Sequence, residues 1–337
     1  MNWLALDIGG ANMKVADGAD YAQSYVFALW RDSQKLAQQI RTAIFEAPPC
    51  DHLAVTMTGE LADCFESKAA GVRFILQAVS SGCDNRHTRV YLVDGRMVTP
   101  QVAITMPHLA AAANWHALAR YAGRLAPHGA AMLIDVGSTT CDVIPLVDGI
   151  PVAAGTSDTQ RLLSGELVYT GVERSPVCAV AQTIPYRGQS CPVVQERFAA
   201  MQDAYVLLGN LPEDLGDTNT SDGRPLSKAA SRARLGRMIA ADGDEFNHRD
   251  AVAAAQSLAQ AQSATLATAI AKVRARLPSP LAAVILSGHG EFLAENALAS
   301  LPQPVSTMSL TGQLGPTLSR SATAHALAVL AREATSR

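Results

Sequence analysis

The sequence predicts an α/β protein built from two related domains. Its 337 residues are enough for two domains of ordinary size. Short apolar runs alternate along the chain with longer stretches of helical periodicity, which is typical of α/β proteins. The chain also contains an internal repeat, LALDIGGANMKV at 4–15 and LIDVGSTTCDV at 133–143. The two copies match when Asp7 is aligned with Asp135, which predicts a duplicated α/β domain.

The first half of the chain is expected to form strands and helices in alternation. Each expected strand is a short apolar run bounded by polar or glycine-containing turns. Asp32 is suited to capping the first helix, along which Leu36, Ile40 and Ile44 share one face. Pro107 opens an alanine-rich helix. The strands are expected at 3–6, 14–16, 24–28, 53–56 and 89–93, and the helices at 32–47, 68–79 and 107–125.

The second half repeats this alternation around one irregular stretch. Residues 176–225 contain proline, glycine and cysteine without a clear period, and we expect an insertion or a substrate-facing loop region there. The strands are expected at 131–134, 142–146, 151–154, 283–286 and 305–308, and the helices at 226–240, 249–277, 291–299 and 316–331. The predicted domains are 1–115 and 128–312, with a C-terminal helix over 316–332 that packs back at the domain interface.

Composition argues against several classes of protein. The net charge is −3 and only 17% of residues are charged, so no basic excess is available for nucleic acid. The six cysteines include no CxxC spacing, which favours free thiols in a reducing cytoplasm. The apolar stretch 251–271 is interrupted by polar residues, and the N-terminus lacks the features of a signal peptide. We therefore expect a cytoplasmic protein with no membrane segment.

The repeated turn is suited to binding a metal-bound phosphate. Glycines let backbone N–H groups approach phosphate oxygens closely, and a strand-end carboxylate can hold Mg²⁺ or its water shell. We expect Asp7 and Asp135 to hold Mg²⁺ and Lys14 to supply a positive charge. The expected phosphate-binding residues are Gly9, Gly10 and Asn12 in the first copy and Gly137, Ser138 and Thr139 in the second.

A third glycine-rich turn follows the apolar run 284–286. It reads Ser-Gly-His-Gly and leads into a helix, whose N-terminus can receive an anion. Ser287, Gly288 and Gly290 are the expected phosphate-binding residues of this turn, while His289 is more often a structural hydrogen-bonding residue in such a place.

Together the three turns resemble the actin, heat-shock-type chaperone and sugar-kinase superfamily. That resemblance implies two ribonuclease-H-like domains with a cleft between them, in which a phosphate ligand and a metal are bound. The chain further resembles the hydantoinase/oxoprolinase family, and within it proteins linked to tetrahydromethanopterin one-carbon transfer. Five blocks carry this resemblance: 6–14, 57–63, 134–143, 165–177 and 287–293.

The family resemblance implies a reaction. The archaeal relatives are methanofuran-pathway synthases, which join a furanylmethyl diphosphate to the phenol of glutamyl-tyramine with loss of diphosphate. A Mg²⁺-dependent transferase making an aryl ether is therefore expected, with small-molecule diphosphate and phenolic substrates. ATP binding is permitted but not required. Two alternatives stay open: an ATP-dependent kinase or amidohydrolase, and a non-catalytic nucleotide-binding regulator.

Further side chains are candidates for this reaction. Glu60 and Glu166 are candidate general bases for the phenol, although either can instead serve a helix end. Arg174 is suited to gripping a carboxylate or phosphate, or to pairing at the surface. One basic cluster is formed by Arg224, Lys228, Arg232, Arg234 and Arg237. It is either a solvated helix face or a site for an anionic substrate, and its candidate substrate-binding members are Arg224, Lys228 and Arg232.

Overall fold

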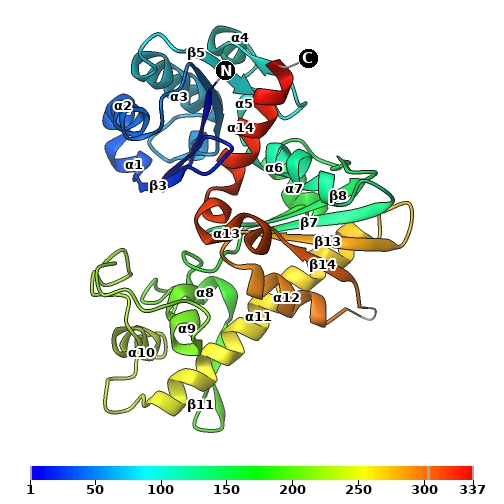
Figure 1. Cartoon of the computed structure of the whole chain (residues 1–337). Coiled ribbons are helices and arrows are strands. Elements are labelled where there is room, and N and C mark those ends of the chain that lie inside the picture. The colour runs from blue at the N-terminus through cyan, green and yellow to red at the C-terminus, as the bar shows by residue number, and fades with distance from the viewer. Residues whose placement is uncertain (1, 302–303, 336–337) are drawn as a thin grey trace.

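The computed structural model describes residues 2–301 and 304–335 and shows one large sheet in each half of the chain (Figure 1). The first sheet has the order β3 (Ala22–Val26), β2 (Asn12–Ala16), β1 (Trp3–Ile8), β4 (His52–Met57), β5 (His87–Tyr91) and β6 (Met97–Val98). The second has the order β10 (Leu167–Val168), β8 (Cys141–Val147), β7 (Ala130–Val136), β13 (Leu281–Ser287) and β14 (Ser306–Ser309). A short strand, β9 (Ile150–Pro151), pairs with β8.

Both sheets have the same topology. In each, the first strand pairs antiparallel with the second and parallel with a later strand, which in turn pairs parallel with the next. On its other side the second strand pairs antiparallel with β3 in the first sheet and with β10 in the second, where the short β9 comes first in the chain and also pairs with β8. These edge strands complete the same order in both sheets. This is the ribonuclease-H-like arrangement, present twice, as the internal repeat predicts. The α/β fold class with two such domains is confirmed.

Three expected strands end before the predicted residue. The strand expected at 89–93 is β5 and ends at Tyr91. In the other two, another group takes the backbone N–H that would continue the strand. The strand expected at 24–28 is β3 and ends at Val26, since the amides of Phe27 and Leu29 donate to carbonyls of the β1–β2 turn. The strand expected at 151–154 ends at Pro151, because the amide of Ala154 donates to a side-chain carboxylate.

The helices of the first domain cover its sheet. Asp32 does not cap a long helix, because its carboxylate pairs with Arg31 and Lys35, both at 2.9 Å. The expected helix is therefore divided into α1 (Leu29–Asp32), a 3-10 turn and α2 (Leu36–Glu46), whose predicted apolar face is buried. The other helices of this domain are α3 (Lys68–Gly82), α4 (Pro100–Thr105) and α5 (Pro107–Ala110).

Two helices lie between the sheets (Figure 1). The helix expected at 107–125 is broken, because Ala112 has a left-handed φ of 46° between α5 and α6 (Asn114–Ala122). The helix expected at 316–331 is divided between α13 (Leu310–Arg320) and α14 (Ala322–Thr335). α6 packs against α14, β8 and β9, while α14 packs against β1, β2 and β4. One apolar cluster therefore contains residues of both sheets and both helices.

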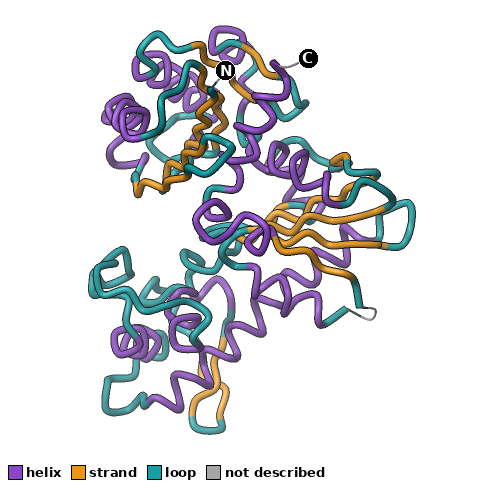
Figure 2. Tube along the Cα trace, in the orientation of Figure 1, coloured by secondary structure: helices purple, strands orange, loops and turns teal. Residues whose placement is uncertain are grey.

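The stretch expected to be irregular forms part of a distal lobe. It contains α8 (Val177–Val180), the hairpin β11 (Thr183–Tyr186) and β12 (Gln189–Pro192), and α9 (Met201–Leu208). The lobe also holds α10 (Lys228–Arg237) and one end of α11 (His248–Arg274), which connects it to the second sheet (Figure 2). The stretch therefore contains short regular elements that pack on α11, and its assignment as an insertion or a substrate-facing region stays a prediction.

The two remaining helices, α7 (Asp158–Ser164) and α12 (Glu291–Ala299), contact strands of the second sheet. In the part of the chain that the structure describes, no helix combines the length and apolar character that a membrane crossing requires.

Candidate active site

The two copies of the repeat form matching hairpin turns. In the first, the Gly9 amide donates to the Asn12 carbonyl at 3.0 Å, and in the second the Gly137 amide donates to the Thr140 carbonyl at 2.9 Å. These bonds close the turns, so the N–H groups of both glycines are not free for phosphate, contrary to the expectation for those two amides. A Cβ on Gly9 would lie 2.9 Å from the Asn12 carbonyl oxygen, which explains the need for glycine there.

The next two amides of each turn are unoccupied. The carbonyls of Gly10 and Ala11 accept bonds from the segment that follows β3, and those of Gly137 and Ser138 accept bonds from residues 172–174. These hydrogen bonds to the carbonyl oxygens fix the orientation of the peptide groups in both turns. Within residues 2–301 and 304–335, the amides of four turn residues have no acceptor, namely Gly10, Ala11, Ser138 and Thr139. Free consecutive N–H groups of this kind suit phosphate oxygens.

Charged side chains of the two hairpins act on one another's pKa values across the domain boundary. Burial raises the pKa of Asp135 to about 6, and the neighbouring Asp142 adds to the rise. The Lys14 ammonium, from the first domain, opposes it. Burial also raises the pKa of Asp142, to which the charge of Asp7 contributes. The two hairpins therefore bring one cation and three carboxylates together.

Asp142 is a site residue that sequence reasoning missed. It pairs in register with Asp135, as Lys14 pairs in register with Asp7. Lys14 and Asp142 are equivalent positions of the repeat, so the alignment contained the signal. Asp142 accepts from the buried Arg161 guanidinium, whose carbon lies 4.2 Å from the centroid of the Trp115 ring.

Asp7 has an oxygen suited to a metal ion. It is 4% exposed, and its Oδ2 accepts a hydrogen bond from the Thr323 hydroxyl of α14. Its Oδ1 is buried and has no partner. Among the described residues, no three His, Cys, Asp or Glu side chains converge as a complete ligand set. Mg²⁺ keeps several waters and binds through one or two carboxylates, so the unpartnered oxygen of Asp7 suits such an ion, and a metal role for Asp7 and Asp135 stays a prediction.

The third turn closes against the second hairpin. Ser287 pairs in register with Asp135. The Gly290 amide donates to the Val136 carbonyl at 3.1 Å. Contrary to the expectation, this amide is therefore not free to bind phosphate. Gly288 has a φ of 85°, and a Cβ there would lie 2.2 Å from the Val136 carbonyl oxygen. The turn therefore lies directly over the end of β7.

The block 165–177 contributes a loop that packs on the second hairpin turn. A Cβ on Gly171 would lie 2.4 Å from the Thr139 nitrogen, so only glycine permits this approach. Glu173 lies 3.0 Å from the His289 ring. Burial acts to raise the pKa of Glu173, but His289 and the more distant Lys14 hold it below its usual range.

Cations gather around this loop. Arg320 also acts to lower the pKa of Glu173. Burial lowers the pKa of Arg174, and the nearby Arg197 lowers it further. Arg174 extends over the Trp30 ring of the first domain, 5.3 Å from its centroid. Within the described chain, Lys14, Arg174 and Arg197 have no carboxylate within ion-pair distance. An anionic ligand would supply the missing charge.

Glu60 is a buried carboxyl at the edge of this site. Gly59 packs against Gly9, where a Cβ would lie 3.1 Å from the Gly9 oxygen. The Glu60 side chain is 1% exposed, and among the described residues its Oε2 has no hydrogen-bond partner. Burial raises its pKa to about 7, Asp158 adds to the rise, and the Ala112 amide opposes it. The Ala112 amide thus turns to Glu60 where the expected helix breaks.

Glu60 has an equivalent in the second domain. Asp7 pairs with Thr56 and Asp135 with Ser287, and four residues after each partner stands a glutamate. In the second domain this is Glu291, whose carboxylate accepts bonds from Ser309 and Thr311. Only Glu60 of this pair keeps an unpartnered buried oxygen.

The structure assigns Glu166 to another role. Its carboxylate is fully buried and accepts from the amides of Ala154 at 2.7 Å and Gly155 at 3.2 Å. It also pairs with Arg276 at 2.7 Å. Because both oxygens are occupied, the expectation that Glu166 takes a proton from the phenol is corrected, and it holds the 154–155 segment instead.

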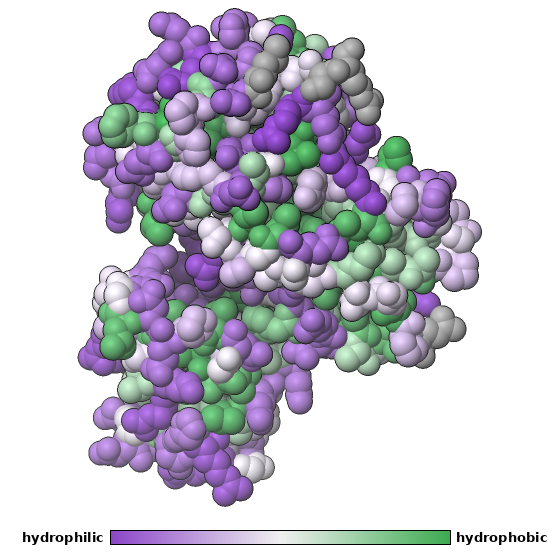
Figure 3. All heavy atoms as spheres, in the orientation of Figure 1, coloured by the Kyte–Doolittle hydropathy of each residue, from purple (hydrophilic) through white to green (hydrophobic). Residues whose placement is uncertain are grey.

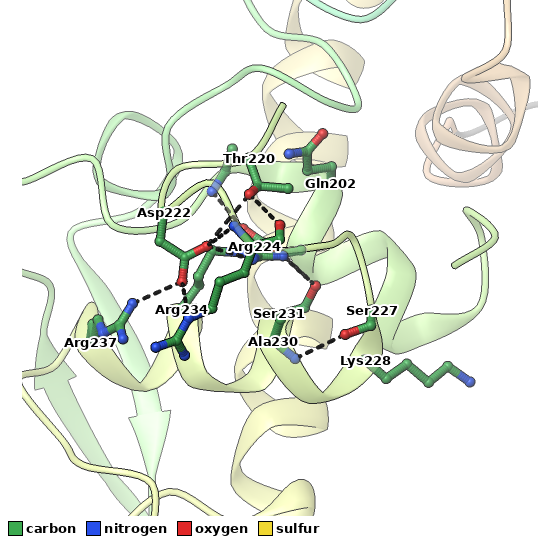
Figure 4. Close-up of polar contacts among 12 residues, drawn as sticks. Gln202, Thr220, Asp222, Arg224, Ser227, Lys228, Ala230, Ser231, Arg234 and Arg237 are labelled. Carbon is green, nitrogen blue, oxygen red and sulfur yellow. Dashed lines mark hydrogen bonds and ion pairs between the residues drawn. The ribbon is translucent and has the colours of Figure 1, made fainter. Parts of the chain in front are cut away.

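The basic cluster is built around Asp222 in the distal lobe (Figure 4). The buried Arg234 bridges Asp222 and Asp203 at 2.9 and 2.7 Å. Arg232 donates to carbonyls of its own lobe, at Gly243 and Phe246, so its expected substrate role gives way to a structural one. Arg224 and Lys228 are exposed, and Lys228 points away from the cluster. Neither contacts the hairpins, and their substrate role stays a prediction.

The molecule is hollowed between the first domain and the distal lobe (Figure 3). Figure 1 shows that the second domain bounds this hollow on the inner side.

The chain is similar to proteins of one family over most of its length. The model of the hydantoinase/oxoprolinase family matches residues 51–333. The chain is 30% identical over 298 residues to the (4-{4-(2-(gamma-L-glutamylamino)ethyl)phenoxymethyl}furan-2-yl)methanamine synthase of Methanocaldococcus jannaschii, an alignment that covers 88% of each protein. A protein of the same name from Methanococcus vannielii is 28% identical over 170 residues, covering 50% of this chain and 75% of that relative.

Solved structures add one finding. Component A of the (R)-2-hydroxyglutaryl-CoA dehydratase of Acidaminococcus fermentans aligns with 100% of both chains, at 11% identity and a TM-score of 0.46.

Proposed function

Because the chain belongs to the hydantoinase/oxoprolinase family, we propose that it is a transferase that condenses a furanylmethyl diphosphate with a glutamylated phenol. The product is an aryl ether, and diphosphate is released. The similarity to a synthase whose named product is a phenoxymethylfuran, over 88% of both chains, supports this reaction over phosphate transfer. We place it in the biosynthesis of a methanofuran-type cofactor for tetrahydromethanopterin-linked one-carbon transfer, in the cytoplasm.

The observation that carries the diphosphate half of the reaction is the set of unoccupied donors at the two hairpins. The free amides of Gly10, Ala11, Ser138 and Thr139 bind phosphate oxygens, and the unpaired Lys14 ammonium adds a charge. As the bond between the furanylmethyl carbon and the diphosphate oxygen breaks, negative charge develops on that oxygen. Donors already in place stabilise it without reorganisation.

Asp7 and Asp135 are the residues that would hold Mg²⁺. Bound there, the ion would help neutralise the leaving diphosphate. Thr323 donates to one oxygen of Asp7 and so leaves the other, unpartnered oxygen directed for this purpose. ATP is not a reactant in this proposal, because the furanylmethyl diphosphate carries its own leaving group.

Glu60 is the proposed general base. The furan ring oxygen delocalises positive charge onto the ring as the diphosphate leaves, and the phenol oxygen then forms the new bond to the methylene carbon. The phenol proton passes to a base, and a carboxyl with a pKa of about 7 is matched to that role near neutral pH. The unpartnered Oε2 of Glu60 would accept the phenol hydroxyl, which requires the domains to part slightly because that oxygen is buried.

The reaction is tested by incubating the purified protein with a furanylmethyl diphosphate, Mg²⁺ and γ-glutamyltyramine in the absence of ATP. We expect one pyrophosphate to be released for each ether detected by mass spectrometry. A strict requirement for ATP, or phosphate transfer to the phenol without pyrophosphate release, would contradict the proposal and favour a kinase.

A further inference from the structure

A cavity of about 240 Å³ lies between the two domains, beside the hairpin site. Its apolar walls come from the first domain, at Ala69 on α3, Pro107 on α5 and the link between α5 and α6. Its charged wall combines Lys68 of α3 with Asp158 at the start of α7. The volume is below the roughly 300–1,000 Å³ of pockets for drug-sized ligands, so it suits a ligand with a single ring.

The charged wall crosses from one domain to the other. The Lys68 Nζ lies 2.6 Å from the Asp158 Oδ2. This contact uses one of the three N–H groups of the ammonium and one of the two carboxylate oxygens. In the described part of the chain the Asp158 Oδ1 has no hydrogen-bond partner. A ligand with adjacent ammonium and carboxylate groups can therefore dock on the pair without breaking it, placing opposite charges next to each other.

The cavity is next to the reacting groups of the proposed function. Ala112, whose amide turns to Glu60, lines it. The charges of Lys68 and Asp158 both act on Glu60. Glu60 in turn follows Gly59, which packs on the first hairpin turn. A ligand in the cavity is thus next to Glu60, the proposed base. The free amides of the hairpin turns and Lys14 are left for the diphosphate.

We propose that this cavity holds the acceptor, with its ring on the apolar wall and its amino-acid headgroup on the Lys68–Asp158 pair. The carboxylate of the headgroup binds Lys68 and its ammonium binds Asp158. This inference rests on the proposed function, since it names the acceptor of that reaction as an aromatic compound with a zwitterionic head. Lys68 and Asp158 are then specificity-determining residues.

The test compares acceptors with and without the headgroup. In Lys68→Met and in Asp158→Asn, the KM for γ-glutamyltyramine should rise roughly ten- to a hundredfold, the effect of one lost charge-assisted bond. The KM for phenol and the KM for the furanylmethyl diphosphate should stay unchanged. Ala69→Leu, which fills the cavity without touching the charges, should raise the KM of both phenolic acceptors. The control is Arg73→Met, an exposed cation on the same helix, which should change nothing.

Binding of γ-glutamyltyramine, measured calorimetrically without the donor, separates this inference from the proposed function. Weaker binding in Lys68→Met with no ether formed by the wild type would support the cavity assignment and contradict the reaction. Ether formation with unchanged acceptor KM in Lys68→Met and Ala69→Leu would overturn the cavity assignment alone. Equal losses for all acceptors and for the diphosphate would also overturn it, because they would mark the pair as a contact that only holds the domains together.

Discussion

Replacing Glu60 by glutamine is expected to stabilise the protein at alkaline pH and to impair the reaction. The side chain is 1% exposed, and burial raises its pKa from 4.5 to about 7. The folded state therefore binds this proton more tightly than the unfolded state does. Stability from this group is fully present below pH 4.5, falls as the pH rises, and is lost above about pH 7.

The size of the effect follows from the same shift. At about 1.4 kcal/mol per pKa unit, the rise corresponds to about 3 kcal/mol of stability lost between pH 4.5 and pH 8. Glutamine has the same shape and stays neutral, so Glu60→Gln lacks this loss. The wild type and the variant should differ by about 3 kcal/mol more at pH 8 than at pH 4.5.

Urea unfolding at the two pH values measures this difference. The matched control is Glu291→Gln at the equivalent position of the second domain, which should lower stability because its carboxylate accepts three hydrogen bonds. If Glu60 is the base, Glu60→Gln also lowers kcat and removes the acidic limb of the pH–rate profile near pH 7. A stability difference that is the same at pH 4.5 and pH 8 would refute the reasoning from burial.

Four other variants are expected to separate the roles of the site residues. Asp7→Asn and Asp135→Asn should fold normally but lose most activity, with only partial rescue by excess Mg²⁺; wild-type turnover in both would exclude the metal role. Lys14→Met should slow ether formation about ten- to a hundredfold, because one charge-assisted contact to the diphosphate contributes about 1.5–3 kcal/mol, while acceptor binding measured by calorimetry persists. Glu166→Gln should lower the midpoint of thermal unfolding, since it weakens the contact with Arg276, yet retain kcat per folded molecule; a large loss of kcat with unchanged stability would return Glu166 to the list of candidate bases.

The hairpins could be predicted because everything that defines them is local. Aspartate, glycine and the return strand lie within ten residues, and the second copy repeats the pattern. The same alignment contained Asp142, opposite Asp135 as Lys14 is opposite Asp7. Which amides are free could not be predicted, because it depends on the Asn12 and Thr140 carbonyls that close the turns.

Contacts between distant segments decided the rest. Glu166 looked like a free carboxylate because its partner Arg276 is 110 residues away. Thr323, which orients Asp7, comes from the other end of the chain. Alanine periodicity continues through Ala112, so the left-handed backbone conformation that breaks the helix there has no local signal.

The most direct test of the account follows the phenolic oxygen. We would label that oxygen of γ-glutamyltyramine with ¹⁸O and incubate it with the wild-type protein, a furanylmethyl diphosphate and Mg²⁺. The account predicts that the label is retained in the ether and absent from the released pyrophosphate, because the bond broken joins the methylene carbon to the diphosphate. Label in a phosphate ester, or an ether that has lost it, would contradict the account.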